Sequence, residues 1–208
     1  MRRTKEDARQ TRVRIIAAAR DMFVRRGVSR TSLEQVARAA GVTRGAIYWH
    51  FANKTELFYA MREQVSLPMV DRIGLTLQRG GDDPLEDIER LLADIVQTVE
   101  HDACARQTFR IIAFKCEYVS ELERELRNQA RGHAELYARL VRAYRSARRS
   151  GILRARLKPE IAALETCAFL SGLIRLWLLD QPTMRVRKSA ARLIAAHVAT
   201  KRAHKQVS

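Results

Sequence analysis

The most constraining feature of this chain is the stretch Gly41–Phe51, in which one helix ends and a very short one begins. Gly41 is expected to end the preceding helix, because glycine readily adopts the left-handed backbone that follows a helix C-terminus. Thr43 then follows as an N-cap, and Asn53–Glu56 has the N-cap-x-x-Glu spacing that opens another helix. The enclosed helix is therefore only about nine residues long.

This short helix would expose an unusual set of side chains. Its only apolar row is formed by Ile47 and Phe51, four residues apart. Small residues beside Arg44 permit close approach to base edges, and the polar tips of the aromatic residues and the histidine can reach phosphate oxygens. We therefore interpret this segment as the DNA-recognition helix of a helix-turn-helix. Its predicted DNA contacts are Thr43, Arg44, Gly45, Ala46, Tyr48, Trp49 and His50.

The N-terminal residues resemble those of the TetR-type repressors, and within them the AcrR-like regulators of multidrug efflux. The resemblance is carried by Thr31–Glu34, Ala37, Ala40–Gly45, Ile47–Phe51 and Lys54–Phe58. Weaker similarity extends to Lys115–Val119 and Ser171–Leu173. Thr31, Ser32 and Lys54 lie in the matched segments and complete the predicted DNA contacts. The resemblance implies a C-terminal domain that forms a homodimer and binds a small hydrophobic or amphipathic inducer.

The charge of the chain agrees with a nucleic-acid partner but does not require one. The formal charge is +16, and residues 1–60 carry +8 of it, with 13 Lys or Arg and 5 Asp or Glu. Such a field concentrates nucleic acid or anionic lipid near the protein. An architectural DNA-binding protein without sequence preference therefore stays open, as does a TetR-type regulator of a different pathway. A membrane-surface protein is disfavoured, because Thr43, Arg44 and Gly45 do not form the Lys- and Arg-rich face of an interfacial helix.

Hydrophobic periodicity predicts an all-α fold of about nine helices, without strands or internal repeats. Thr31 and Glu34 are expected to form a capping box, Asp83 and Pro84 to open a helix, and Pro68 to kink one. The helices are expected near residues 8–26, 31–40, 43–51, 54–79, 84–101, 103–118, 121–150, 159–179 and 184–204. We expect a helix-turn-helix DNA-binding domain at residues 1–53 and a ligand-sensing and dimerisation domain at residues 54–208.

Residues 159–179 combine leucines with small residues on one helix face, which would let a partner helix approach closely. The pattern by itself fits a core within one chain equally well, and the resemblance to the family favours a dimer. The predicted dimer interface consists of Leu164, Ala168, Gly172, Leu176, Leu193, Ile194 and His197.

Methionine and aromatic side chains are spread over several predicted helices. Close packing would make them a core, and looser packing would make them a pocket for an apolar ligand. The resemblance favours the pocket. Its candidate residues are Met61, Arg62, Met69, Ile73, Val96, Phe109, Ile112, Cys116, Glu117, Tyr137 and Trp177.

No catalytic, cofactor or metal site is predicted. The chain has no GxSxG, P-loop, GxGxxG or HExxH motif, and its histidines lack the spacing of a tetrahedral site. Cys104, Cys116 and Cys167 are expected to be reduced packing residues of a cytoplasmic protein. The longest apolar run near the C-terminus, Phe169–Leu179, is interrupted by Arg175 and falls short of a membrane span. The predicted function is a ligand-responsive repressor of a palindromic operator, bound by one or two dimers.

Overall fold

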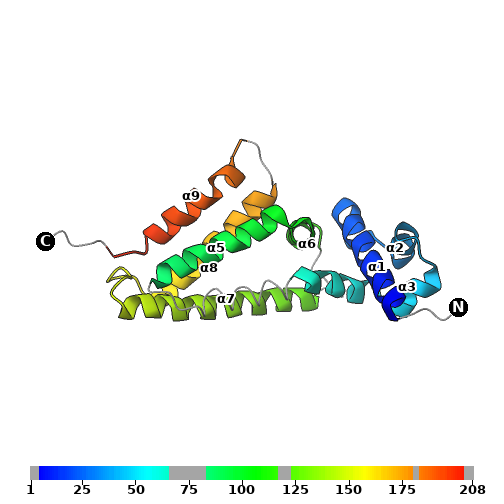
Figure 1. The fold of residues 1–208 in the computed structure, drawn as a ribbon, viewed down its shortest axis with the longest axis horizontal. Helices are drawn as coiled ribbons and strands as arrows, with labels where there is room; N and C mark the ends of the chain where they lie inside the picture. Colours follow the sequence, from blue (N-terminus) through cyan, green and yellow to red (C-terminus); the bar gives the residue numbers. More distant parts are fainter. Residues whose placement is uncertain (1–4, 66–82, 117–122, 180–182, 204–208) are drawn as a thin grey trace. The chain divides into compact units, whose positions relative to one another are not determined.

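A computed structural model of the chain describes residues 5–65, 83–116, 123–179 and 183–203. These residues form helices and their connections, with one isolated antiparallel bridge between Leu153 and Arg202 (Figure 1). The predicted all-α class is therefore confirmed. The helices are α1 (Lys5–Arg26), α2 (Leu33–Ala39), α3 (Arg44–His50), α5 (Pro84–His101), α6 (Ala103–Phe114), α7 (Glu123–Arg149), α8 (Pro159–Leu179) and α9 (Val186–Ala199).

Residues 54–65 form a further helical segment. Its predicted cap is present, because the Asn53 side chain accepts a hydrogen bond from the Glu56 backbone N–H at 2.8 Å. At the start of α5, Asp83 caps Leu85 at 2.9 Å and Pro84 occupies the first turn, as predicted. The kink expected at Pro68 lies outside the described residues.

The predicted cap of α2 is wrong by one residue. Ser32, not Thr31, is the N-cap, and its hydroxyl accepts from the Gln35 N–H at 3.3 Å. The Gln35 side chain in turn accepts from the Ser32 N–H at 3.1 Å, which completes the capping box. The Thr31 hydroxyl instead donates to the Gly27 carbonyl at 2.8 Å, so this threonine belongs to the preceding turn.

The chain divides into two compact units, and the first comprises Met1–Pro68 with Ala103–Leu126. Its core joins α1, α2, α3 and residues 54–65 to Ile111 of α6. The Val28 backbone N–H also donates to the Lys115 carbonyl, just after α6, at 3.0 Å. Because residues 54–65 and α6 share this core, the unit extends beyond the domain boundary expected after residue 53.

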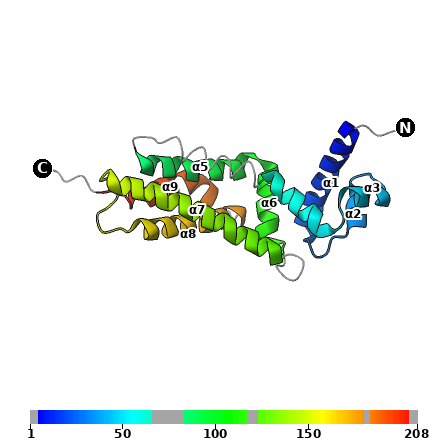
Figure 2. The same cartoon turned by 90° about the horizontal axis from the view of Figure 1, so that it is seen from below.

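The second unit comprises Met69–Asp102 with Arg127–Ser208. Here α9 packs against both α5 and α8 (Figures 1 and 2). Asp83, at the start of α5, forms an ion pair of 2.6 Å with Arg202, which follows α9. The Arg154 backbone N–H donates to the Lys201 carbonyl at 2.9 Å and joins the α7–α8 connection to the same end of α9.

Candidate nucleic-acid interface

Helix α3 is short because capping groups stand close together at its two ends. The Thr43 hydroxyl accepts a hydrogen bond from the Ala46 N–H at 3.1 Å, and the helix ends at Phe51, whose backbone is extended. Ile47 is 0% exposed and Phe51 is 1% exposed, so this pair anchors α3 in the core of the first unit. The predicted apolar row of the recognition helix is confirmed.

The other residues of α3 face outward. Trp49 is 73% exposed and Tyr48 43%, which are unusual values for aromatic residues in a folded protein. Around Gly45 an added Cβ would meet nothing within 4 Å, so the backbone there lies open to a partner. Thr43 and Arg44 are exposed, whereas Ala46 and His50 are half-buried. The face of α3 that would meet DNA is therefore polar, aromatic and accessible.

Arg44 and Tyr48 converge on a carboxylate of α2. The Tyr48 hydroxyl donates to Glu34 Oε1 at 2.9 Å, and Arg44 Nε lies 3.7 Å from the same oxygen. The pKa of Glu34 lies below its ordinary value, first because the carboxylate accepts its own backbone N–H and then because Tyr48 and Ser32 donate to it. Sequence reasoning had used Glu34 only as a capping residue, because its contact with α3 arises from tertiary packing.

A hollow of about 520 Å³ lies beside α3, around the start of α2 and the residues that follow α3. The Lys54 ammonium group donates to the Ser29 carbonyl at 3.2 Å across this hollow. Ser32 is exposed, whereas Thr31 is 2% exposed and its hydroxyl is bound to Gly27. The side chain of Thr31 is therefore withdrawn from the surface on which we had expected it. The hollow is lined by Ser29, Arg30, Thr31, Ser32, Leu33, Gln35, Tyr48, Ala52, Asn53 and Lys54.

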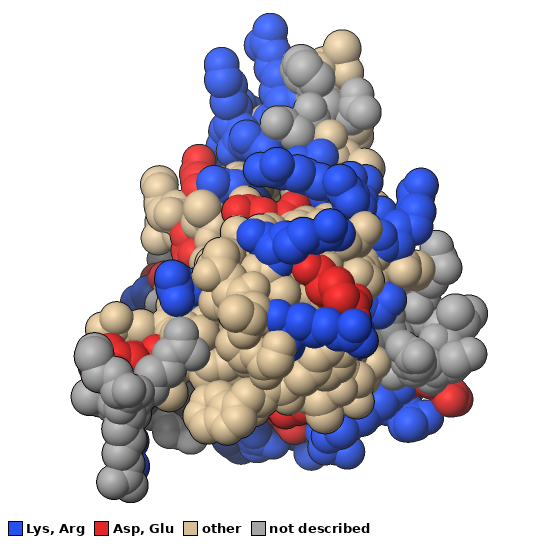
Figure 3. Space-filling view, turned by 90° about the vertical axis from the view of Figure 1, so that its right-hand side faces the viewer, with Lys and Arg blue, Asp and Glu red and all other residues tan. Residues whose placement is uncertain are grey.

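Cationic side chains line the hollow, at Arg30 and Lys54, and lie beside the end of α3. Figure 3 shows one face of the molecule, on which Lys and Arg side chains predominate over Asp and Glu. Arg12 of α1 lies over the Phe51 ring at 5.0 Å from its centroid, next to the end of α3. A surface of this charge attracts phosphates without regard to sequence.

Helix α8, at the predicted dimer interface, is apolar on two faces. Its inner face, which includes Leu170, Leu173 and Trp177, is buried within the second unit. By length and composition alone α8 could cross a membrane, contrary to our expectation, but this inner face makes it a core helix of the unit. The outer face of α8 is exposed and largely apolar, with Ile161, Leu164, Ala168, Gly172, Leu176 and Leu179, and it also carries Glu165, Ser171 and Arg175.

The α9 residues predicted for the interface divide into two kinds. Leu193 is 42% exposed, whereas Ile194 is 2% exposed and already buried within its own chain. His197 is half-buried, stacks on the Phe169 ring with 4.2 Å between centroids, and shares a hydrogen bond of 2.9 Å with the Thr166 hydroxyl. Ile194 therefore has little surface left for a partner, because α9 turns it toward the packed interior.

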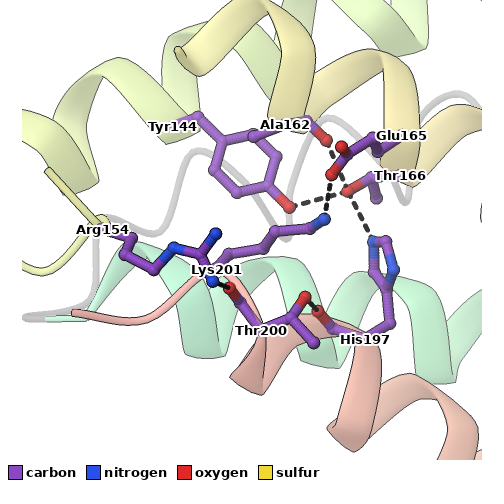
Figure 4. A network of polar contacts seen from close by, with 8 residues as sticks. All are labelled: Tyr144, Arg154, Ala162, Glu165, Thr166, His197, Thr200 and Lys201. Atoms are coloured by element: carbon purple, nitrogen blue, oxygen red, sulfur yellow. Dashed lines mark hydrogen bonds and ion pairs between the residues drawn. The ribbon is translucent and has the colours of Figure 1, made fainter. Parts of the chain in front are cut away.

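His197 belongs to a polar network that joins α7, α8 and α9 (Figure 4). Thr166 also shares a hydrogen bond of 2.7 Å with the Tyr144 hydroxyl, and Lys201 pairs with Glu165. Burial raises the pKa of Tyr144 to about 12. Burial, and then the charge of Lys201, lower the pKa of His197 to about 4, so this histidine is neutral at physiological pH.

The predicted pocket residues are divided between the two units. Met61 is buried in the core of the first unit, against which Ile112 and Cys116 pack. Arg62 is paired through Nε with Glu125 Oε1 at 2.8 Å, and Phe109 lies on α6 in the same unit. Val96, Tyr137 and Trp177 belong to the second unit. Met69, Ile73 and Glu117 lie outside the described residues.

Two family models match this chain. Residues 15–61 match the bacterial regulatory proteins of the tetR family. Residues 83–201 match the C-terminal region of MAATS-type transcriptional repressors. The chain belongs to the TetR family. Its resemblance to TetR-type repressors is thereby confirmed, as is its assignment to regulators of transcription rather than enzymes.

Individual TetR-family proteins are similar over most of the chain. The transcriptional regulator TtgR of Pseudomonas putida is 38% identical over 180 residues, 86% of this chain and 85% of TtgR. The crystal structure of NalD, the secondary repressor of the MexAB-OprM multidrug efflux pump in Pseudomonas aeruginosa, matches with a TM-score of 0.83 and 32% identity over 97% of this chain and 100% of NalD. A complex of SmeT with triclosan matches with a TM-score of 0.79 and 29% identity over 96% of this chain and 94% of SmeT.

Proposed function

We propose that this chain represses multidrug efflux genes by binding a palindromic operator as a homodimer, and that a hydrophobic or amphipathic inducer releases it. The observation that carries the proposal is helix α3, whose accessible polar face is anchored by the buried Ile47. The TetR-family relatives support the regulated target, because NalD and SmeT are described as repressors of multidrug efflux pumps. We place this activity in the cytoplasm, where the operator DNA lies.

The outer face of α8 supports a homodimer. In a single chain Leu164 is 59% exposed, and Ile161, Leu176 and Leu179 are also exposed. Covering these apolar side chains is favourable, and a second copy of α8 provides a self-complementary, largely apolar surface. Leu193 of α9 is exposed as well and extends the proposed interface.

The dimer leads to a geometric expectation for the operator. Two recognition helices related by a two-fold axis enter successive major grooves about 34–36 Å apart, so the operator is an inverted repeat. Selection from a pool of randomised duplexes tests this directly. A selected site without inverted symmetry would contradict a single two-fold dimer, and equal affinity for all duplexes would support the architectural alternative. Protein-to-DNA stoichiometry on the selected site distinguishes one dimer from two.

The segment 54–65 is the proposed route from inducer to DNA. It begins beside Lys54, a predicted DNA contact, and its buried Met61 packs in the core of the first unit. Arg62 on the same segment pairs with the fully buried Glu125 of α7, so movement of either helix would strain an ion pair. An inducer that favours a different tilt of this segment would displace α3 and weaken operator binding reciprocally.

The expected coupling between inducer and operator is about 1–3 kcal/mol. Hydrophobic antimicrobials, dyes and flavonoid-like compounds are suitable probes, with binding measured by calorimetry and operator affinity by fluorescence anisotropy. We expect at least one of them to weaken operator binding. A compound that binds tightly but leaves operator affinity unchanged would show that the segment 54–65 is a rigid connector.

Two further assays address the remaining alternatives. Sedimentation with anionic vesicles at physiological salt tests for a membrane-surface protein, and we expect the chain to stay in the supernatant. Mapping the selected operator onto promoters tests the regulated pathway. If the selected operator lies upstream of genes unrelated to efflux, the protein is still a repressor, but of a different pathway.

A further inference from the structure

Glu34 of α2 meets the predicted base-reading arginine at one particular atom. The nearest approach of the ion pair is between Arg44 Nε and Glu34 Oε1, at 3.7 Å. The Arg44 guanidinium also lies over the Tyr48 ring, 5.7 Å from its centroid, and the Tyr48 hydroxyl donates to the same carboxylate oxygen at 2.9 Å. One carboxylate on α2 therefore contacts two residues of α3 that we expect to contact DNA.

The contact between Glu34 and Arg44 Nε determines which nitrogens of the guanidinium stay available for a base. Guanine is recognised through O6 and N7 by two parallel N–H groups of one arginine. A carboxylate that engages Nε leaves the edge formed by the two Nη atoms free for this purpose. We propose that Glu34 is a positioning residue for sequence recognition, which holds Arg44 through Nε so that its Nη edge meets guanine. The proposal rests on the proposed role of Arg44 as the base-reading residue.

Glu34 is itself held in place, as a positioning residue must be. It lies in the first turn of α2, between Ser32 and Gln35, whose side chains and backbone form the capping box. Its pKa is lowered by its own backbone N–H, by Tyr48 and by Ser32, so the carboxylate is charged at physiological pH. A group mounted on a capped helix positions its partner better than a group on a loop.

The same carboxylate affects random DNA in the opposite sense. A negative charge on a surface that faces phosphates opposes binding to any duplex, whatever its sequence. On the operator this cost is offset if Glu34 orients Arg44 toward guanine, and on random DNA nothing offsets it. Glu34 would thus increase the ratio of specific to non-specific affinity. Removal of its charge should move the two affinities in different directions.

The test compares four full-length proteins, which are the natural sequence, Glu34→Gln, Arg44→Ala and the double variant. Glutamine keeps the length of the side chain and an acceptor for Tyr48 but removes the charge. Affinity is measured by fluorescence anisotropy on the duplex selected from a randomised pool, on its single-base variants and on a random duplex. Glu63→Gln, an exposed acid on the segment 54–65, serves as the control for a unit change in charge.

We expect Glu34→Gln to weaken binding to the selected duplex about two- to five-fold, the range that an exposed ion pair supports. Binding to the random duplex should stay equal or become tighter, and the preference for one guanine should flatten. In the Arg44→Ala background, Glu34→Gln should cause no such loss. Glu63→Gln should tighten both duplexes equally or leave both unchanged.

Three outcomes would overturn the proposal, and they differ from one another. Tighter binding to both duplexes would make Glu34 a source of charge repulsion alone. An equal loss with and without Arg44 would show that Glu34 acts through the stability of α2, which thermal unfolding of the variants would reveal. If Arg44→Ala by itself leaves every base preference unchanged, the role of Arg44 fails first and the positioning role fails with it.

Discussion

Helices α3 and α8 both present an exposed face that awaits a partner, but the two faces differ in chemistry. On α3 the exposed groups are polar or aromatic, and the Arg44 and Tyr48 side chains both contact Glu34 in the free protein. On α8 the exposed groups are mainly leucine, isoleucine and small residues, with Leu164 59% exposed. Water can form hydrogen bonds with the polar groups on α3, whereas the apolar groups on α8 are more stable when another apolar surface covers them.

This difference predicts how each helix binds its partner. The free energy gained by covering the outer face of α8 scales with apolar area, so dimer formation should depend on protein concentration and little on salt. Binding at α3 releases counterions from DNA, so it should weaken steeply as salt is added. Substitutions on either helix test whether the two faces bind their partners in these two ways.

The largest effect is expected from Leu164→Asp, which puts a charge into the proposed apolar interface. An unpaired buried charge costs about 3–5 kcal/mol, a factor of about 10²–10⁴ in a binding constant. Analytical ultracentrifugation should show a monomer at concentrations where the natural chain is a dimer, and operator affinity should fall accordingly. Leu126→Asp changes an exposed leucine outside α8 and should leave the dimer intact. A Leu164→Asp protein that still dimerises would place the interface elsewhere.

Arg44→Ala should have the next largest effect, and only on the operator. Loss of a bidentate contact with guanine costs about 1–3 kcal/mol of discrimination. We expect this loss on the selected duplex and little change on random DNA, measured by fluorescence anisotropy at one salt concentration. Equal losses on the two duplexes would make Arg44 a phosphate contact.

Lys54→Ala should change the salt dependence instead of the sequence preference. The slope of log K against log[salt] is negative, and loss of one phosphate contact reduces its magnitude by about one unit. The slope is measured by titrating the selected duplex at several salt concentrations. Lys158→Ala removes an exposed lysine from the second unit and should leave the slope unchanged. If the slope for Lys54→Ala equals that of the natural chain, Lys54 does not contact a phosphate.

Near neutral pH the smallest effect is expected from His197, because its titration affects stability only at acid pH. Its pKa in the folded chain is about 4, below the ordinary 6.5, so the unfolded chain binds a proton at a higher pH than the folded chain. This contribution to stability is present above about pH 6.5 and is lost as the pH falls toward 4. The midpoint of urea unfolding, followed across this range, should depend less on pH in His197→Gln than in the natural chain. An unchanged dependence in His197→Gln would assign the titration to other groups.

Local sequence signals were sufficient to predict the positions of most helices, including the proposed recognition helix α3. The α8 bounds agree with those expected from the sequence, and Thr43, Asn53 and Asp83 cap the helices that they were expected to cap. Such signals act within a few residues, through hydrogen bonds to orphan N–H groups and through helical periodicity. They need no knowledge of distant segments.

Contacts between distant segments were decided only by the tertiary structure. The choice of Ser32 over Thr31 as the cap is more local, because the Thr31 hydroxyl donates to the carbonyl of Gly27, four residues earlier, which a capping pattern does not record. Glu34 meets Tyr48 because α2 and α3 cross, and Ile111 of α6 joins the core of the DNA-binding unit because α6 packs on α1. Local sequence patterns were enough to locate the helices approximately and to indicate their apolar faces, although the bounds of α2 and α9 differ from those expected. Which helix packs against which depends on contacts between residues that are far apart in the sequence. A local sequence pattern does not contain this information.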